Sequence, residues 1–127
     1  MSCASVKDLI GCNYKTHGRS KEEGFDCFGI VIEVLRRNNI VIPDVNYESI
    51  DEYESVFVET QSKIKYKKIE HPIELCVIMF NVKGEPRHTG IYLGDGFFIH
   101  ATRSGVRVDP LHRWKNRIVG CYKLINS

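Results

Sequence analysis

The pattern of hydrophobic and polar positions divides the chain into a helical part followed by a strand-rich part. Residues 26–38 predict a mostly buried helix, because apolar side chains recur at helical spacing at Phe28, Val31, Ile32 and Leu35. Asp26 can be the N-cap of this helix, with Phe25 and Ile30 at the positions of a hydrophobic staple. Gly29 inside the helix costs about 1 kcal/mol relative to alanine, and close approach of a sheet would explain it.

Shorter or more polar segments flank this helix. Residues 5–12 indicate a short helix, and residues 13–24 read as a polar loop because they are rich in Gly, Ser, Lys and Glu. The acidic residues between 44 and 61 indicate a helix at the surface.

From residue 63 onward the pattern is typical of strands. Residues 75–82 form a nearly continuous apolar run, which predicts a central strand. The other predicted strands are 63–69, 88–93, 97–102, 106–108 and 117–124. Helices first and an antiparallel sheet afterwards indicate an α+β fold, with N-terminal helices packed on a central antiparallel sheet. The length of 127 residues predicts one domain over residues 1–127.

The predicted hairpin carries two histidines, His88 and His100, around a Gly-Asp-Gly sequence. If Asp95-Gly96 is a two-residue turn, counting back along the strands places the two rings on opposite faces. If residues 94–96 form a three-residue loop, both rings share one face as diagonal neighbours, about 7–8 Å apart at the backbone. One residue of register decides between the two, and the sequence of the hairpin leaves both open.

Composition excludes several classes of function. A net charge of +2 favours no particular partner, and the lysines at 63, 65, 67 and 68 mostly alternate, which is typical of a solvated strand edge rather than of a nucleic-acid site. No secretory signal or apolar run long enough to span a membrane occurs, so we expect a soluble chain that is cytoplasmic as synthesised.

The cysteines divide into one with a distinctive setting and four without. Their odd number, five, and the lack of a CxxC spacing argue against a disulfide framework or a structural zinc site, so we expect reduced thiols. Cys27 would be the first residue of the buried helix, where the helix dipole stabilises a thiolate and lowers the thiol pKa. Cys76 and Cys121 lie in apolar strands, where a thiol is typical of core packing.

A cysteine on an apolar helix is usually a core residue, and a single strand histidine is no stronger a signal. The combination is more specific. A cysteine at a helix start, a strand histidine and a second polar residue on the next strand follow the order of a papain-like triad.

Four segments resemble motifs of the NlpC/P60 cysteine peptidases. The first two are Ile10-Gly11-Cys12-Asn13-Tyr14, similar to Leu-Gly-x-Pro-Tyr, and Gly24-Phe25-Asp26-Cys27-Phe28-Gly29, similar to Asp-Cys-Ser-Gly. The other two are His88-Thr89-Gly90-Ile91-Tyr92-Leu93-Gly94, similar to His-Val-Gly-Ile-Tyr-Leu-Gly, and Ile99-His100-Ala101, similar to the strand of the third polar residue. The resemblance covers about residues 9–124 and implies the papain-like fold of that family.

The resemblance also implies roles for the residues in these motifs. Cys27 would be the nucleophile, His88 the general base and His100 the residue that orients His88. Tyr14 and the backbone N–H of Cys27 would stabilise the oxyanion, and such a donor contributes about 2.7–4 kcal/mol. Asp26 stands beside the nucleophile at a substrate or oxyanion position, although a helix cap is the role we favour for it.

The implied reaction is hydrolysis of peptidoglycan stem peptides, typically at the bond after D-glutamate (a γ-D-glutamyl-diamino acid bond), through a thioester and with no cofactor or metal. The size and the Asp-Cys-Phe-Gly variant are most similar to phage-tail members. An alternative is therefore a tail assembly component, carried by the virion and in contact with other tail proteins, with little or no hydrolase activity.

A further alternative is an amidase or acyltransferase of the same superfamily. The circularly permuted relatives place the histidine before the cysteine, whereas Cys27 precedes His88 in this chain, which lowers that option. A zinc site of Cys27, His88 and His100 has no evident fourth ligand.

Two departures from the family pattern limit what the resemblance implies. Phe28 stands where the family has a serine associated with substrate contacts, so peptide preference is not carried over. Pro72-Ile73-Glu74 replaces the usual Pro-Gly-Asp. If Cys27 is catalytic, we expect the three-residue loop, Gly96 at positive φ, and both imidazoles on one face above the start of the helix.

Overall fold

The computed structural model describes residues 5–42, 66–82 and 85–124 of the chain. Its helices are the 3-10 helices η1 (Lys7–Leu9) and η3 (Leu111–Arg117) and the α-helix α1 (Cys27–Arg37). Its strands are β1 (Arg19–Ser20), β2 (Gly24–Phe25), β3 (Tyr66–Ile69), β4 (Val77–Val82), β5 (Glu85–Gly94), β6 (Phe97–Thr102), β7 (Gly105–Pro110) and β8 (Ile118–Leu124). The surface helix predicted for residues 44–61 lies outside the described residues.

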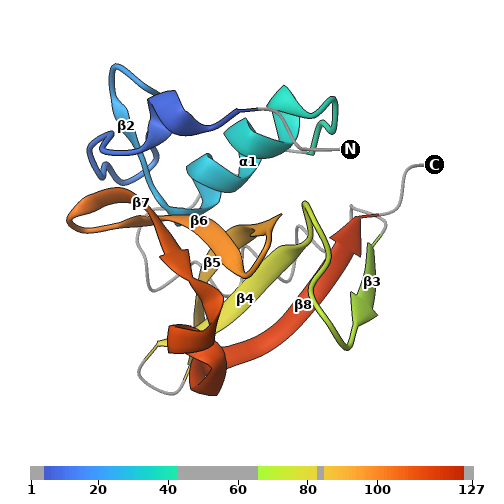
Figure 1. Ribbon diagram of the computed structural model, residues 1–127. Helices are drawn as coiled ribbons and strands as arrows, with labels where there is room; N and C mark the ends of the chain where they lie inside the picture. The colour runs from blue at the N-terminus through green and yellow to red at the C-terminus, as the bar shows by residue number, and fades with distance from the viewer. Residues whose placement is uncertain (1–4, 43–65, 83–84, 125–127) are drawn as a thin grey trace.

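Six antiparallel strands form the central sheet in the order β3-β8-β4-β5-β6-β7 (Figure 1). This sheet, with helices contributed by the N-terminal part of the chain, confirms the α+β fold. The strand predicted to be central, β4, lies between β8 and β5, and β3 is at an edge of the sheet. Lys67 and Lys68 of β3 are exposed, as the alternating pattern indicated.

Three segments differ from the prediction. The polar loop of residues 13–24 contains the start of a small two-stranded sheet, in which β1 pairs with β2. The last predicted strand is preceded by η3, and β7 extends to Pro110 rather than ending at residue 108. Two-residue strands and short 3-10 turns contain too few positions for a periodic pattern, so the sequence does not reveal them.

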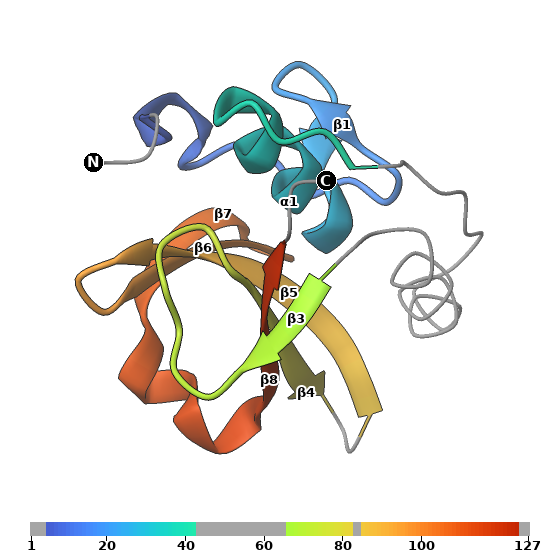
Figure 2. The same cartoon turned by 90° about the vertical axis from the view of Figure 1, so that its right-hand side faces the viewer.

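Two hydrophobic clusters lie on the two faces of the sheet, because alternate residues of a strand point to opposite sides. In both views α1 and η1 cover one face and η3 lies on the other (Figures 1 and 2). The first cluster joins α1 and η1 to strand residues that include Val77, Met79, Ile91, Ile99 and Ala101. The second cluster comprises Cys76, Ile78, Phe80, Phe98, Leu111 and Cys121, with Trp114 of η3 packed against it.

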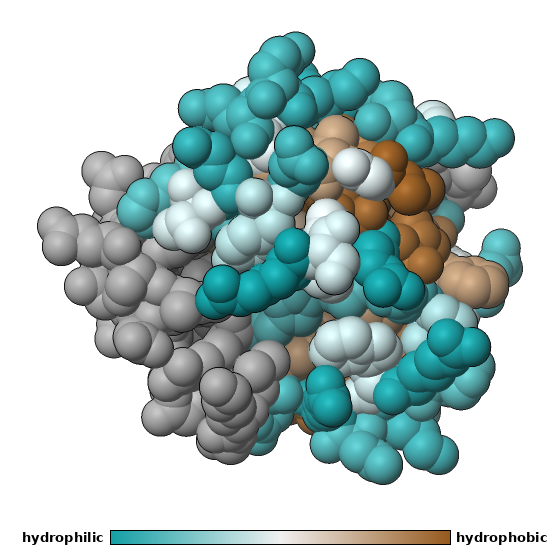
Figure 3. All heavy atoms as spheres, turned by 90° about the vertical axis from the view of Figure 1, so that its left-hand side faces the viewer, coloured by the Kyte–Doolittle hydropathy of each residue, from teal (hydrophilic) through white to brown (hydrophobic). Residues whose placement is uncertain are grey.

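The described surface is mostly polar on the side shown in Figure 3, where hydrophobic side chains are visible only in a limited area. None of the helices in the described part of the chain has the length and apolar character needed to cross a membrane.

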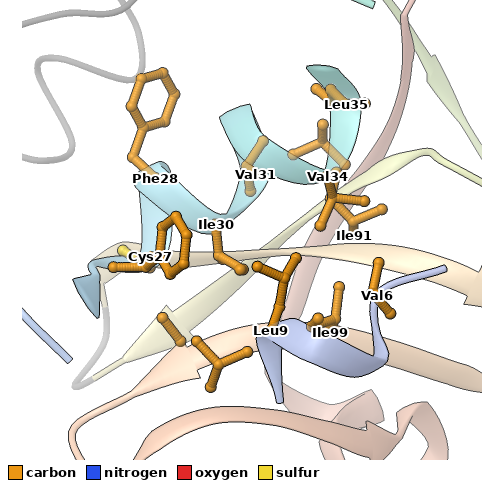
Figure 4. Packing of buried hydrophobic residues seen from close by; sticks show 14 of the residues in the cluster. Val6, Leu9, Cys27, Phe28, Ile30, Val31, Val34, Leu35, Ile91 and Ile99 are labelled. Atoms are coloured by element: carbon orange, nitrogen blue, oxygen red, sulfur yellow. The ribbon is translucent and has the colours of Figure 1, made fainter. Parts of the chain in front are cut away.

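Helix α1 begins where the sequence predicts. The side chain of Asp26 accepts a hydrogen bond from the backbone N–H of Gly29 at 2.7 Å, which confirms Asp26 as the N-cap. Phe25 and Ile30, the residues of the predicted staple, are both fully buried. Ile30 of α1 points toward the sheet and Leu9 of η1, Cys27 lies at the start of the helix, and the ring of Phe28 points away from the sheet (Figure 4).

The need for glycine at position 29 has a different cause from the predicted one. A Cβ built at Gly29 would lie 2.2 Å from the carbonyl oxygen of Gly18, in the loop before β1. The expected close approach of the sheet is therefore wrong, because it is the loop backbone that packs against the first turn of α1.

The hairpin between β5 and β6 closes through a two-residue turn, Asp95-Gly96, combined with a bulge. Tyr92 pairs with Phe98, but Gly94 pairs with the next residue back, Phe97, so β5 contains one extra residue. The predicted three-residue loop is therefore wrong in form, whereas Gly96 has the predicted positive φ, 89°. The bulge supplies the same one-residue shift of register that the longer loop would have supplied.

Replacing Gly29 by alanine should destabilise the fold, although in an ordinary helix interior alanine is favoured over glycine by about 1 kcal/mol. The new Cβ would collide with the backbone at Gly18, so the loop or the helix start must move. We expect a lower free energy of unfolding in urea for G29A. Arg36→Ala, an exposed change in the same helix that removes only a surface ion pair with Glu33, should alter it by less than about 0.5 kcal/mol. An increase for G29A would contradict this account.

Candidate active site

The imidazoles of His88 and His100 form the centre of the candidate site. Nε2 of His88 lies 2.7 Å from Nδ1 of His100, and the ring centroids are 5.0 Å apart. The bulged register brings Gly90 against His100, where an added Cβ would lie 3.3 Å from the Cβ of His100. A glycine at this position therefore leaves room for the rings to meet, and the prediction that both share one face is confirmed.

Cys27, the first residue of α1, contacts β5, the strand that carries His88. The residue is 3% exposed, and its carbonyl oxygen accepts a hydrogen bond from Oγ1 of Thr89 at 3.1 Å. Thr89 follows His88 directly, so the first residue of α1 lies beside the strand position of the candidate base.

The direction of the two rings corrects one expectation. Since neighbouring residues of a strand point to opposite faces, Thr89 points toward α1 and His88 toward the second cluster. The ring centroid of His88 lies 5.7 Å from that of Phe80, and the ring of His100 lies 4.4 Å from that of Phe98. The rings thus occupy the sheet face opposite the buried stripe of α1, together with the aromatic residues of the second cluster.

Tyr14 is close to Cys27 in both structure and electrostatics. It forms an isolated bridge with Phe25, two residues before Cys27, and packs against the cluster that contains Cys27. Burial raises the pKa of Tyr14 to about 12, and the negative charges of Cys27 and Asp26 act in the same direction. Tyr14 therefore keeps its hydroxyl proton over the physiological range and can donate it in a hydrogen bond.

Asp26 acts as an anchor for the loop that surrounds the helix start. The carboxylate is 1% exposed and accepts the backbone N–H groups of Gly29 and, at 2.8 Å, of His17. The guanidinium of Arg19 lies 3.0 Å away. These contacts explain the favoured role as a cap, whereas a contact between Asp26 and a substrate stays a prediction.

The other described cysteines differ from Cys27 in their setting. Cys12, Cys76 and Cys121 are free thiols. Burial raises the pKa of Cys76 to about 12 and also raises the pKa of Cys121. Both thiols, Cys121 in β8 and Cys76 directly before β4, therefore stay protonated, which fits the predicted role in packing.

The comparison with known families settles the relationship of the whole chain. The model of the NlpC/P60 family matches residues 11–123. The chain belongs to the NlpC/P60 family.

Two bacterial proteins are among the relatives of this NlpC/P60 chain. The probable peptidoglycan endopeptidase LytE of Bacillus subtilis is 32% identical over 120 residues, which cover 92% of this chain and 32% of LytE. The murein DD-endopeptidase/murein LD-carboxypeptidase MepS of Escherichia coli K12 is 30% identical over 114 residues, 87% of this chain and 54% of MepS. The chain thus spans about a third of LytE and about half of MepS.

The fold of the NlpC/P60 chain is also found in solved structures. An NlpC/P60 family protein from Bacillus cereus superposes with a TM-score of 0.65 at 24% sequence identity, covering 94% of this chain and 40% of the other. This likeness confirms the predicted papain-like NlpC/P60 fold.

Asp109 is a site residue that the sequence analysis missed. Its Oδ2 lies 2.7 Å from Nε2 of His100, while its Oδ1 lies 3.5 Å from the guanidinium of Arg107. The alternation of residues 106–109, Val-Arg-Val-Asp, was the available signal, because in the observed pairing Asp109 lies opposite Phe98 and shares the face of His100. The strand predicted for residues 106–108 ended one residue too early to include it.

Trp114 is a second residue that the sequence did not reveal. Its ring stacks on His88 at an interplanar angle of 25° and meets His100 edge-on at a centroid distance of 5.1 Å. With Phe80 and Phe98 it surrounds the two imidazoles by aromatic surface. This enclosure lowers the pKa of both histidines, because burial disfavours the charged ring. Both His88 and His100 are therefore neutral at neutral pH.

A metal site was considered from the sequence as an alternative. Among the described residues, no group of three or more His, Cys, Asp or Glu side chains is arranged to hold a metal ion.

The lowered pKa of His88 and of His100 makes stability depend on pH. Below about pH 6.5, the ordinary histidine pKa, the unfolded chain binds more protons than the folded chain. The free energy of unfolding therefore falls as the pH falls. We expect the Tm of the wild type to drop more steeply between about pH 6.5 and pH 4 than that of His88→Gln, measured by circular dichroism.

His112→Gln serves as the control, since His112 is exposed on η3. This variant should keep the steepness of the wild type. Equal slopes for wild type and His88→Gln would show that the buried pair does not govern the acid sensitivity.

Proposed function

We propose that this chain is a cysteine endopeptidase that hydrolyses peptide bonds in peptidoglycan stem peptides. The observation that carries the proposal is the 2.7 Å contact between His88 and His100. Thr89, the residue after His88 in β5, donates a hydrogen bond to the carbonyl of Cys27 and so joins this contact to the helix start. Membership of the NlpC/P60 family and the names of LytE and MepS support peptidoglycan as the substrate.

The reaction begins with attack of the Cys27 sulfur on the carbonyl carbon of the scissile bond. The thiol proton passes to Nδ1 of His88, the ring nitrogen that the contact with His100 leaves available. His88 then gives this proton to the leaving amine as the C–N bond breaks, and a thioester remains. Water attacks the thioester as His88 accepts its proton, and the C–S bond breaks to release the product as a carboxylate. The proton held by His88 then returns to the sulfur of Cys27 and restores the thiol.

Tyr14 and the backbone N–H of Cys27 are the proposed donors to the oxyanion of the tetrahedral intermediate. The raised pKa of Tyr14 supports this role, because a hydroxyl that stays protonated can donate a hydrogen bond to the negative charge that develops on the oxyanion. Asp26 contributes indirectly by fixing the first turn of α1.

The bond we propose is the γ-D-glutamyl-diamino acid bond. Phe28 stands in place of the family serine, so this position offers no hydroxyl to a substrate. Its side chain is also buried, at 2% exposure. Association with a phage tail, a main role in tail assembly and action at the cell wall after delivery by a virion stay predictions of the sequence.

Cys27→Ala should abolish the release of peptide fragments from purified muropeptides, because the proposed thioester forms on the sulfur of Cys27. The measurement is fragment release followed by mass spectrometry. Cys12→Ala, which removes a half-buried free thiol outside the proposed site, should retain the wild-type rate.

Thiol labelling separates a wrong substrate from a wrong nucleophile. An alkylating reagent should modify Cys27 of the wild type well below pH 8, and His88→Gln should suppress this labelling. Equal hydrolysis by wild type and Cys27→Ala would refute the proposal outright.

Tyr14→Phe should reduce kcat by about 10²–10³-fold with a small change in KM, as expected for loss of one oxyanion donor. The variant keeps the ring that packs against the first cluster, so its Tm should stay close to that of the wild type. Hydrolysis at the wild-type rate would remove Tyr14 from the mechanism.

A further inference from the structure

We propose that Asp109 is a positioning residue that fixes the proton positions of both histidines and so leaves Nδ1 of His88 free to accept a proton. The inference deepens the proposed function, on which its catalytic meaning rests. Its structural content, the placement of two ring protons, can be measured without any substrate.

The placement follows from a chain of three polar side chains. An ionised carboxylate can only accept hydrogen bonds, so the 2.7 Å contact between Asp109 and Nε2 of His100 requires the proton of His100 to be on Nε2. Nδ1 of His100 then has a lone pair and must accept from Nε2–H of His88 across their 2.7 Å contact. His88 consequently has no proton on Nδ1, which is the form that a general base needs.

Arg107 occupies the second oxygen of the carboxylate. Its guanidinium lies 3.5 Å from Oδ1 of Asp109. In the observed pairing Arg107 lies opposite His100 on the neighbouring strand, so β7 contributes both charged groups of the network.

The carboxylate also compensates for the charge that appears during the reaction. When His88 accepts a proton, a positive charge forms inside the aromatic enclosure, where burial opposes it. Asp109 acts against the effect of burial on His100, while Arg107 adds to it. His88, Asp109 and Arg107 are thus the charged or titratable groups that the described structure places around His100.

Asp109→Asn is the sharpest test, because Arg107 can only donate hydrogen bonds. The amide oxygen should turn toward Arg107 and the amide N–H₂ toward Nε2 of His100. The proton of His100 then moves to Nδ1, where it faces His88, and the proton of His88 must move to Nδ1 in turn. We expect both tautomers to switch, and kcat to fall by about 10²–10⁴-fold, the range of general-base catalysis, with KM little changed.

The readout is the nitrogen-15 spectrum of the two rings in the full chain at neutral pH, since protonated and unprotonated ring nitrogens differ clearly in chemical shift. In the wild type, both His88 and His100 should be protonated at Nε2 only. Asp95→Asn, a change in the hairpin turn at a positive φ that asparagine tolerates, should leave spectrum and rate unchanged.

Each outcome bears on one claim. A wild-type spectrum with the proton of His88 on Nδ1, or identical tautomers in wild type and Asp109→Asn, would overturn the inference even if a variant folds poorly. A switch of tautomers together with a loss of rate would support it. A switch of tautomers in a chain whose wild type hydrolyses no muropeptide would support the positioning role of Asp109 and refute the proposed function.

Discussion

The geometry of the candidate site depends on one extra residue in β5. The bulge near Leu93 shifts the β5–β6 register by one position, which places His100 against Gly90 and within hydrogen-bond distance of His88. Without this residue the two rings would lie on opposite faces of the sheet. The turn, the bulge and the glycine therefore act together, and a change that shifts the register they set would alter the contact on which the rest of the histidine network is built.

A second, separate constraint sets the position of the helix start. The buried carboxylate of Asp26 binds the first turn of α1 and the loop at His17 and Arg19, so the loop and the helix are held as one unit. Thr89 then connects this unit to β5 through the carbonyl of Cys27. The two halves of the site are thus organised independently, one by strand register and one by capping, and they meet at adjacent residues of β5.

The sequence predicted those features that depend on periodic or local signals. The cap at Asp26 and the buried stripe of α1 were accessible in this way, whereas the shared face of the two histidines was expected only on the condition that Cys27 is catalytic. The bulge and η3 were not accessible, because both are too short and irregular to produce a periodic pattern, and the approach of Gly18 to Gly29 was not, because it depends on how the loop folds back on the helix. Asp109 lies between these cases. Its alternation with Val108 was visible, but its partner could be identified only once the β6–β7 pairing was known.

The aromatic enclosure explains why a carboxylate belongs at the end of the histidine chain. Phe80, Phe98 and Trp114 surround the imidazoles and favour their neutral forms, which suits the resting state but opposes the protonated base. A site built only from the two histidines would have to place that charge in an apolar setting without compensation. The carboxylate of Asp109 sits at the far side of His100, where it can stabilise this charge while remaining paired with Arg107. The enclosure and the carboxylate are therefore complementary parts, since the first excludes water from the hydrogen bonds and the second makes proton transfer within them possible.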